Sequence, residues 1–387
     1  MFIKRFFIKG KDRNKLCWCG SGKKFKKCHI DRENQSPIRQ SDFIEINKKV
    51  KNKKICMAPE EIKCDCSKKI IKAHTISKNC NLKSIADEKN NLATLKLSNL
   101  NIEKAENPIC ELSIIGINKA STYQIFCSKH DAELFSVLEN KNFKFENIQI
   151  FMLAYRNLCY ELYLKESILD TNKERRYFDK GKPIEKQLSI QMHFKFYDDI
   201  LNVGIRDLKL LKEKFDLSLI NRKFDYIRYY SIEIDSISQF MGSCIWFPIV
   251  NFDNTKLADL ENIKEIFNPI SASIINVDNK SLIIFSWLKD FYNEQYCMKF
   301  ISSLNKIPND EKSGAILHWF FSSVENLYFQ LSWWNNLKSE EKNILINFYK
   351  QPMLDRFKLD KSFYKKCSHM LNWNILNIKH NLNFINY

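Results

Sequence analysis

Four Cys and His side chains lie within thirteen residues near the N-terminus. The segment reads RNKLCWCGSGKKFKKCHI, and its candidate ligands are Cys17, Cys19, Cys28 and His29. Proteins hold Zn²⁺ with four such side chains in a tetrahedron, so this one segment supplies a complete structural site. A unit this short cannot bury enough surface to fold alone, and metal binding would supply its folding free energy. The sequence therefore predicts a zinc knuckle.

The residues between these ligands suit a small knuckle. Gly20 and Gly22 permit a tight turn, Ser21 can bond backbone amides within it, and Phe25 offers one apolar anchor. The pattern resembles the SEC-C motif, the zinc-binding tail of the SecA translocation ATPase, which also occurs in many unrelated bacterial proteins. The resemblance covers residues 13–30. It implies an adaptor that docks partner proteins and, in some settings, ribosomes or phospholipids.

A second set of Cys and His residues follows, spread over a longer stretch of chain. Cys127 and His130 stand three apart, as expected for two metal ligands at the first turn of a helix, here SKHDAELFSVLE. Cys56 and Cys66 are the chosen upstream pair, with Cys64 as the substitute. Two cysteines on an upstream loop and C-x-x-H at a helix start follow the treble-clef plan. The sequence thus predicts a second zinc site and about two Zn²⁺ per chain.

His74 ends the strand-like segment KIIKAH and has no place in that ligand set. The arrangement resembles the HNH (ββα-metal) nucleases and a bacterial group that joins a SEC-C motif to an AHTIS…FC..HD core. That resemblance implies that His74 is a general base and that Asp131, directly after the C-x-x-H, is a Mg²⁺ or Mn²⁺ ligand.

Two alternatives remain open for this region. The helix carries Asp131 where the nucleases have a His, and His74 lies 53 residues before Cys127. A purely structural or nucleic-acid-binding treble clef fits the same residues. His74 could also replace Cys66 in the zinc shell, which would remove the catalytic candidate.

Positive charge is concentrated at the N-terminal end. Residues 1–80 hold 22 Lys and Arg against 8 Asp and Glu, whereas the other 307 residues hold 40 against 37. A localised basic surface favours a polyanionic partner, usually nucleic acid. A solvated basic surface without a partner is the alternative.

Cysteine usage favours a reducing compartment. Nine of the thirteen cysteines lie between Cys17 and Cys127, close to histidines, which favours metal binding over disulfides. The start, MFIKRFFIKGK, lacks the uninterrupted apolar run of a signal peptide, and no segment approaches the ~18 apolar residues of a membrane span. We therefore expect a cytoplasmic protein with no membrane span.

Composition and periodicity predict a multidomain α+β protein. The expected parts are a SEC-C module (1–40), a basic linker (41–54), a treble-clef or HNH-like zinc domain (55–144) and an α+β domain (145–387). The last part reads as helices around a small antiparallel sheet, with a hairpin turn at Asp278-Asn279. Helices are expected near 146–169, 185–217, 291–305, 310–332, 338–349 and 353–370, and a short one at KSIADEKN.

The C-terminal part shows no catalytic pattern. Its histidines stand without a carboxylate or Cys at ligand spacing, and we interpret them as structural; they are His193, His318, His369 and His380. A role in specificity, sensing or oligomerisation is expected.

The leading functional hypothesis is a zinc-binding, nucleic-acid-interacting protein with HNH-like, divalent-metal-dependent nuclease activity. The alternative is a non-catalytic zinc adaptor that binds a protein partner or the ribosome through its SEC-C module. Neither the substrate nor the oligomeric state follows from the sequence.

Overall fold

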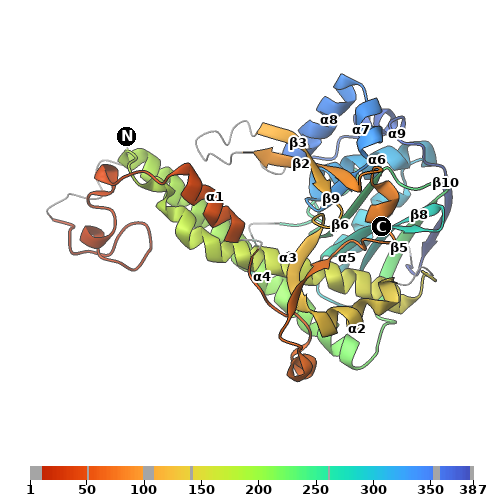
Figure 1. Ribbon diagram of the computed structural model, residues 1–387, viewed down its shortest axis with the longest axis horizontal. Coiled ribbons are helices and arrows are strands. Elements are labelled where there is room, and N and C mark those ends of the chain that lie inside the picture. The colour runs from red at the N-terminus through yellow and green to blue at the C-terminus, as the bar shows by residue number, and fades with distance from the viewer. Residues whose placement is uncertain are drawn as a thin grey trace. The chain divides into compact units, whose positions relative to one another are not determined.

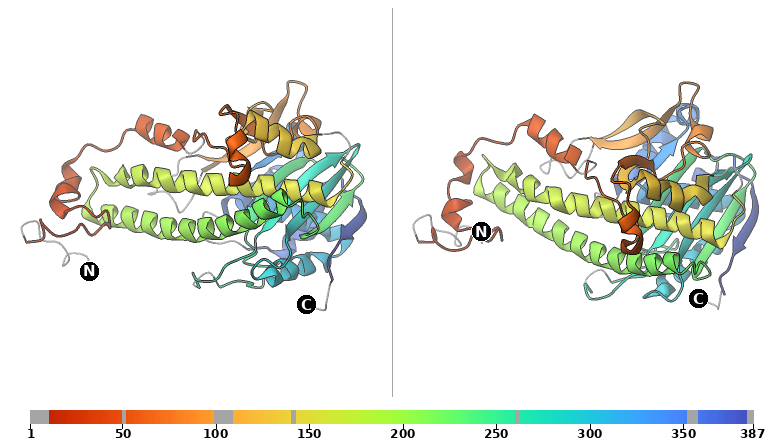
Figure 2. Two further views of the ribbon diagram at one scale, coloured as in Figure 1. Left: turned by 90° about the horizontal axis from the view of Figure 1, so that it is seen from below. Right: turned by 60° about the horizontal axis from the view of Figure 1, so that its bottom comes forward.

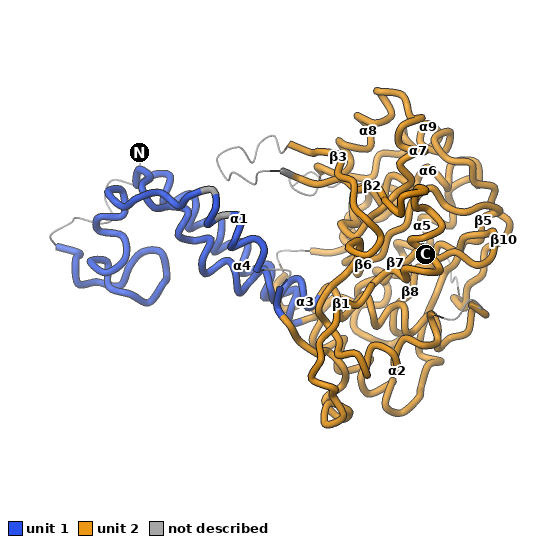
Figure 3. Tube along the Cα trace, viewed as in Figure 1, with its two compact units in different colours: residues 1–53, 162–206 blue, residues 54–161, 207–387 orange. Residues whose placement is uncertain are grey.

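A computed structural model describes residues 11–49, 52–98, 109–139, 143–259, 262–351 and 358–383. The chain divides into two compact units, residues 1–53 with 162–206 and residues 54–161 with 207–387 (Figure 3). Two long helices contribute to both units, because the division falls within each of them. The four-part domain division expected from the sequence stays a prediction.

The first unit contains short helices and parts of the two long ones. Its 3-10 helices are η2 (Phe25–Lys27), η3 (Arg32–Asn34) and η7 (Arg176–Asp179), and its α-helices are α1 (Gln40–Lys49) and the adjoining ends of α3 (Asn147–Arg175) and α4 (Ile184–Ile220). Residues expected to be a linker thus form α1, which Figure 1 shows beside the α3–α4 hairpin. A Lys49–Glu174 ion pair of 2.8 Å joins α1 to α3.

The second unit is built on an eight-stranded sheet of order β10-β5-β8-β7-β6-β9-β2-β3. Its strands are β2 (Asn91–Ser98), β3 (Ile109–Gly116), β5 (Ile227–Ile234), β6 (Phe240–Trp246), β7 (Ile270–Val277), β8 (Lys280–Leu288), β9 (Leu327–Phe329) and β10 (Ile375–His380). All recorded pairings are antiparallel. The β7–β8 hairpin turns at Asp278, whose φ of 54° suits the predicted tight turn.

Helices cover both faces of this sheet (Figure 2). On one face, Phe285 of β8 packs edge-to-face on Trp319 of α6 (Asn309–Ser323), and α5 (Glu294–Asn305) adds Phe300. On the other face, Asn157 of α3 donates hydrogen bonds to Ser271 and Ser273 of β7. Successive residues of a strand point to opposite faces of the sheet. Because helices cover both faces here, both sets of side chains must be apolar or have hydrogen-bond partners.

A smaller element precedes this core in the same unit. Strand β1 (Ile70–His74) pairs antiparallel with β4 (Thr122–Cys127), and β4 leads directly into α2 (Ser128–Glu139). The register places His74 opposite Thr122, and Ile70 opposite Cys127. The predicted helix SKHDAELFSVLE is confirmed, since α2 covers the same twelve residues.

Three expectations on the fold need correction. The sheet is larger than the small one predicted, because β2 and β3, from the stretch placed in the treble-clef domain, join it at one end. The helix expected over 310–332 ends at Ser323; the chain then forms β9, whose edges pair with β6 and β2, before α7 (Leu331–Asn336). KSIADEKN contributes only to η5 (Leu82–Ile85). The apolar residues near 327–329 are compatible with a helix or a strand by their spacing alone. Pairing with β6 and β2 makes this segment a strand.

The remaining helices are α8 (Ser339–Lys350) and α9 (Tyr364–Ser368), with η4 (Glu60–Asp65) and η9 (Lys361–Phe363) as 3-10 turns. Part of the helix expected over 353–370, residues 353–357, lies outside the described residues. None of the helices in the described ranges is long and apolar enough to cross a membrane.

Candidate metal centres

The first cluster brings together the four predicted ligands Cys17, Cys19, Cys28 and His29. Their ligand atoms all lie within 4.8 Å of one another. His29 Nδ1 is 3.2 Å from Cys17 Sγ and 3.1 Å from Cys28 Sγ, and the Cys19 and Cys28 sulfurs are 3.6 Å apart. Tetrahedral zinc with the usual bond lengths would separate such ligands by about 3.5–3.8 Å. The separations of 3.1 to 3.6 Å lie within or slightly below this range, and three sulfurs with one imidazole nitrogen are a donor set that Zn²⁺ binds.

The knuckle folds as its sequence suggests. Gly20 and Gly22 have φ of +75° and +71°, which places both in the left-handed region of the turn between the ligand pairs. The Cys17 amide donates to the Lys23 carbonyl at 2.8 Å, closing that turn. Phe25 is buried against Cys17 in a small apolar cluster. The core of the module thus consists of the Cys/His cluster and Phe25, with Trp18 and Ile30 partly buried against them.

Behind His29 lies a carboxylate that is distant in the sequence. His29 Nε2 is 2.7 Å from Asp179, which is fully buried in η7, 150 residues further along the chain. Arg32 donates from Nε to the other Asp179 oxygen at 2.6 Å, and Gln191 of α4 donates to Asp179 at 2.6 Å. A carboxylate behind a metal-binding histidine fixes the ring and makes it a better ligand. The SEC-C module is thereby fixed to the turn between α3 and α4, within the first unit.

The same contacts determine the pKa of His29. Burial opposes the charged form of His29, but the hydrogen bonds to Asp179 and the neighbouring cysteines outweigh it and raise the pKa of His29 to about 11. Such surroundings favour a positive charge at the centre of the cluster. A divalent cation supplies that charge.

The second cluster is formed by Cys56, Cys66, Cys127 and His130, again within 4.8 Å of one another. His130 Nδ1 is 3.3 Å from Cys56 Sγ and 3.4 Å from Cys127 Sγ. The cluster joins three separate segments: the strand-like chain before η4, the loop after η4, and the β4–α2 junction. Its donor set fits zinc as well as that of the first cluster does. Cys64, the substitute ligand, is exposed and stays outside the cluster.

Backbone amides support the sulfurs of the second cluster. The His130 amide donates to Cys127 Sγ at 3.4 Å, and the Cys127 amide donates to Cys56 Sγ at 3.5 Å. Desolvation opposes the Cys127 thiolate, but hydrogen bonds from the His130 amide and from Ser67 outweigh it and lower the pKa of Cys127 to about 6. A thiolate at neutral pH is the form that binds zinc. His130 Nε2 is buried and, within the described ranges, has no hydrogen-bond partner.

His74 does not belong to the second cluster. It ends β1 half-buried, and its Nε2 lies 3.0 Å from the carbonyl oxygen of Ile117. A carbonyl only accepts, so Nε2 carries the proton and Nδ1 keeps its lone pair. Desolvation, with a smaller contribution from Lys78, lowers the pKa of His74 below its ordinary value of 6.5. The ring is therefore neutral at pH 7.

Asp131 lies half-buried in the first turn of α2, close enough to His74, Glu139 and Arg156 to interact electrostatically. Burial raises the pKa of Asp131. Arg156 pairs with Glu139 at 3.0 Å, and Ser77 donates to the same carboxylate at 2.9 Å. In the described part of the chain, His74 and Asp131 belong to no group of three metal-ligating side chains.

Sequence reasoning missed the residues around both centres. Asp179 and Gln191 reach the first cluster only through the α3–α4 turn, and no spacing rule links positions so far apart. Glu139 ends α2 and Arg156 lies in α3, where each reads as an ordinary charged helix residue. The sequence signal nearest to this network was Arg32, three residues after His29, because a basic residue there suggests a carboxylate partner.

Comparison with known protein families supports the first centre. Residues 13–30 match the SEC-C motif. No curated protein and no solved structure matches the chain. The motif and the two Cys/His clusters indicate a zinc-binding protein.

Proposed function

We propose that this zinc-binding protein binds nucleic acid and hydrolyses phosphodiester bonds, with His74 as the general base. The observation that carries the proposal is the position of His74. It ends the first strand of a β1–β4–α2 unit that supplies two of the zinc ligands, Cys127 and His130, at its β4–α2 junction, and it lies outside the ligand set. A histidine that binds zinc cannot accept a proton from water, whereas a histidine outside the ligand set can.

The tautomer of His74 supports the same role. The Ile117 carbonyl holds the proton on Nε2, which leaves Nδ1 as the acceptor. In the proposed step, Nδ1 takes a proton from water and the resulting hydroxide oxygen attacks phosphorus. The bond from phosphorus to the leaving oxygen then breaks, and that oxygen takes up a proton.

Asp131 would hold Mg²⁺ or Mn²⁺ together with substrate phosphate oxygens and water, the usual coordination of Mg²⁺ in such sites, and the ion would stabilise charge on the phosphate. This coordination needs only one or two carboxylates. It is therefore compatible with the lack of a third three-residue cluster among the described residues.

Cleavage of plasmid DNA and of RNA, with Mg²⁺ and with Mn²⁺, tests the proposal. We expect His74→Ala to lose at least about 100-fold in rate, the usual contribution of a general base, and to retain both zinc ions. His193→Ala, at an exposed position on α4, is the matched control and should cleave like the wild type. Absence of cleavage, or equal rates for wild type and His74→Ala, would exclude the catalytic role.

A second candidate function rests on the surface of the first zinc module. Lys23, Lys24, Lys26 and Lys27 are exposed on the knuckle, and Leu16 beside them is 68 % exposed. Such a basic surface with an apolar residue suits a non-catalytic adaptor for a nucleic acid, the ribosome or a protein. The adaptor predicts salt-sensitive binding without turnover, abolished by Cys28→Ser. Binding that survives Cys28→Ser would exclude it.

A further inference from the structure

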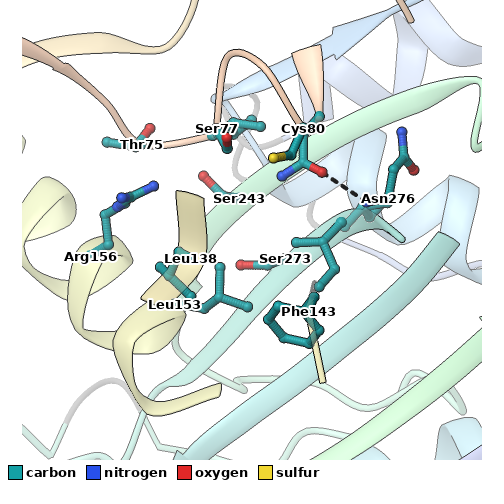
Figure 4. A pocket seen from close by; sticks show the side chains of 14 residues that line it. Thr75, Ser77, Cys80, Leu138, Phe143, Leu153, Arg156, Ser243, Ser273 and Asn276 are labelled. Atoms are coloured by element: carbon teal, nitrogen blue, oxygen red, sulfur yellow. Dashed lines mark hydrogen bonds between the residues drawn. The ribbon is translucent and has the colours of Figure 1, made fainter. Parts of the chain in front are cut away.

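A pocket in the second unit lies beside the β1–β4–α2 element. It is partly open to solvent, with about 500 Å³ of free space in the pocket and at its mouth together. Figure 4 shows the Arg156 side chain on one side, Ser77 and Thr75 above, Ser243 and Ser273 in the centre, and Leu138 and Leu153 below. The pocket thus has a polar end and an apolar wall, the usual composition of a small-ligand site.

Among the described residues that line the pocket, Arg156 alone is cationic, and it is only 3 % exposed. Its one hydrogen bond within the described residues goes from Nη2 to Glu139 at 3.0 Å, and its Nε is buried without a partner there. A guanidinium has five N–H donors. Burying an unpaired donor costs free energy, so an acceptor bound in the pocket would be stabilised by it.

Two serines supply further donors. Ser243 of β6 and Ser273 of β7 are direct cross-strand partners, which places their side chains next to each other on the sheet face that α3 covers. Ser273 Oγ accepts from the Asn157 amide at 2.9 Å, and Ser243 Oγ accepts from the Asn326 amide at 2.7 Å. Each hydroxyl oxygen is therefore already an acceptor. Among the described residues neither hydroxyl has an acceptor, so each O–H proton can be donated into the pocket.

The donors come from three different elements, α3, β6 and β7, so together they can donate at least three hydrogen bonds to one ligand. A tetrahedral anion presents its oxygens in three dimensions, whereas a carboxylate presents two oxygens in a plane. We propose that this pocket binds a phosphate group, held by the guanidinium of Arg156 and the hydroxyls of Ser243 and Ser273.

The phosphate could be inorganic phosphate, a nucleotide or the phosphorylated end of a nucleic acid. All three present the same group to the pocket. The proposal does not rest on the proposed function, because it requires neither His74 nor a divalent metal. Loss of cleavage would leave it intact, and loss of phosphate binding would leave the role of His74 intact.

Titration calorimetry on the full chain tests the proposal, with inorganic phosphate, a nucleoside 5′-monophosphate, a 5′-phosphorylated oligonucleotide and acetate as probes. We expect at least one phosphate probe to bind, acetate to bind more weakly, and the tightest phosphate probe to identify the source. Ser273→Ala should weaken that binding about five-fold, the value of one neutral hydrogen bond. Arg156→Lys keeps the charge but loses the planar donors, and should weaken it at least about ten-fold.

Ser136→Ala, on the exposed side of α2, is the matched control and should bind like the wild type. Ser273→Ala should remain folded, because Asn157 keeps its bonds to Ser271 and to the Ala272 carbonyl. The proposal is overturned if no phosphate probe binds, if acetate binds equally well, or if Ser273→Ala and Arg156→Lys both bind like the wild type.

Discussion

The two Cys/His clusters contain the same ligand types, three sulfurs and one imidazole Nδ1, but differ in how the chain supplies them. The first takes all four ligands from one short segment and fixes its histidine to the buried carboxylate of Asp179. The second takes its ligands from three segments, and its histidine has a buried Nε2 without a partner in the described ranges. A metal in the first cluster would fold a module that Asp179 fixes to the α3–α4 turn. A metal in the second cluster would hold distant segments together.

The two clusters should differ most in how much stability the protein loses when one ligand of each is removed. Cys127→Ser and Cys28→Ser should each lower the zinc content from two per chain to one, measured by elemental analysis. Structural zinc sites contribute roughly 10–16 kcal/mol of binding free energy at pH 7. Cys127→Ser should therefore lower the thermal stability of the second unit strongly, because it releases three segments. Cys28→Ser should unfold only the knuckle.

Cys64→Ser is the matched control for both variants, since Cys64 is exposed and lies outside the cluster. It should retain two zinc ions and the wild-type melting temperature. Equal losses of stability in Cys127→Ser and Cys28→Ser would contradict the distinction between the two centres. Zinc loss in Cys64→Ser would show that Cys64, and not Cys66, is the ligand.

Asp179→Asn should affect the first centre alone. The change leaves the buried Arg32 without its counter-charge, and breaking a buried ion pair in this way typically costs about 3–5 kcal/mol. Loss of such a carboxylate behind a metal-binding histidine typically lowers metal affinity about 10–100-fold. Zinc release to a competing chelator should then accelerate for one ion and not for the other.

Asp199→Asn, at an exposed position of α4, is the control and should release both ions at the wild-type rate. An Asp179→Asn protein with unchanged release of both ions would show that the Asp179 contact does not stabilise the zinc site.

A third buried histidine, His318, lies outside both Cys/His clusters and should make the stability of the protein depend on pH. His318 is fully buried, stacks on Phe348 at 3.7 Å, and has two ring nitrogens without partners in the described part of the chain. Burial lowers the pKa of His318 from 6.5 to about 4. The unfolded chain therefore binds a proton at His318 more readily than the folded chain does. As the pH falls from 6.5 toward 4, the free energy of unfolding should decrease by up to about 3 kcal/mol.

Urea unfolding at pH 7.5 and pH 4.5 measures this loss. His318→Leu should reduce the difference between the two pH values, and His193→Leu, at an exposed position, should leave it unchanged. An identical pH dependence in His318→Leu and wild type would exclude this histidine as its source.

The smallest expected effect concerns the contact between the SEC-C module and the α3–α4 turn. Gly181 has φ +71°, and an added Cβ would lie 2.7 Å from Pro37 Cγ and 2.8 Å from the Gln35 carbonyl oxygen. Gly181→Ala should cost about 1–3 kcal/mol of local stability. Hydrogen exchange should rise around residues 29–37 and stay unchanged around the second cluster.

Gly204→Ala is the control, because its Cβ would meet nothing closer than 3.5 Å within helix α4. Alanine there should stabilise the helix by up to about 1 kcal/mol. Wild-type exchange around residues 29–37 in Gly181→Ala would argue against tight packing of the module on this turn.

Local patterns predicted much of this molecule. The C-x-C…C-H spacing indicated the first cluster, and the C-x-x-H at a helix start indicated α2 and half of the second. Asp278-Asn279 marked the β7–β8 hairpin. In each case the residues that decide the structure lie within a few positions of one another, where spacing and backbone preference act directly.

The contacts that distinguish the two centres were decided by the tertiary structure. Asp179 contacts His29 from 150 positions further along the chain. Strands β2 and β3 pair at one end of the large sheet with strands from the C-terminal part of the chain. Arg156, Ser243 and Ser273 meet in one pocket from three separate elements. A sequence specifies ligand types and local turns, because those depend on neighbouring residues. It does not specify which distant side chain fills the space behind a ligand, because packing of the whole unit selects that partner.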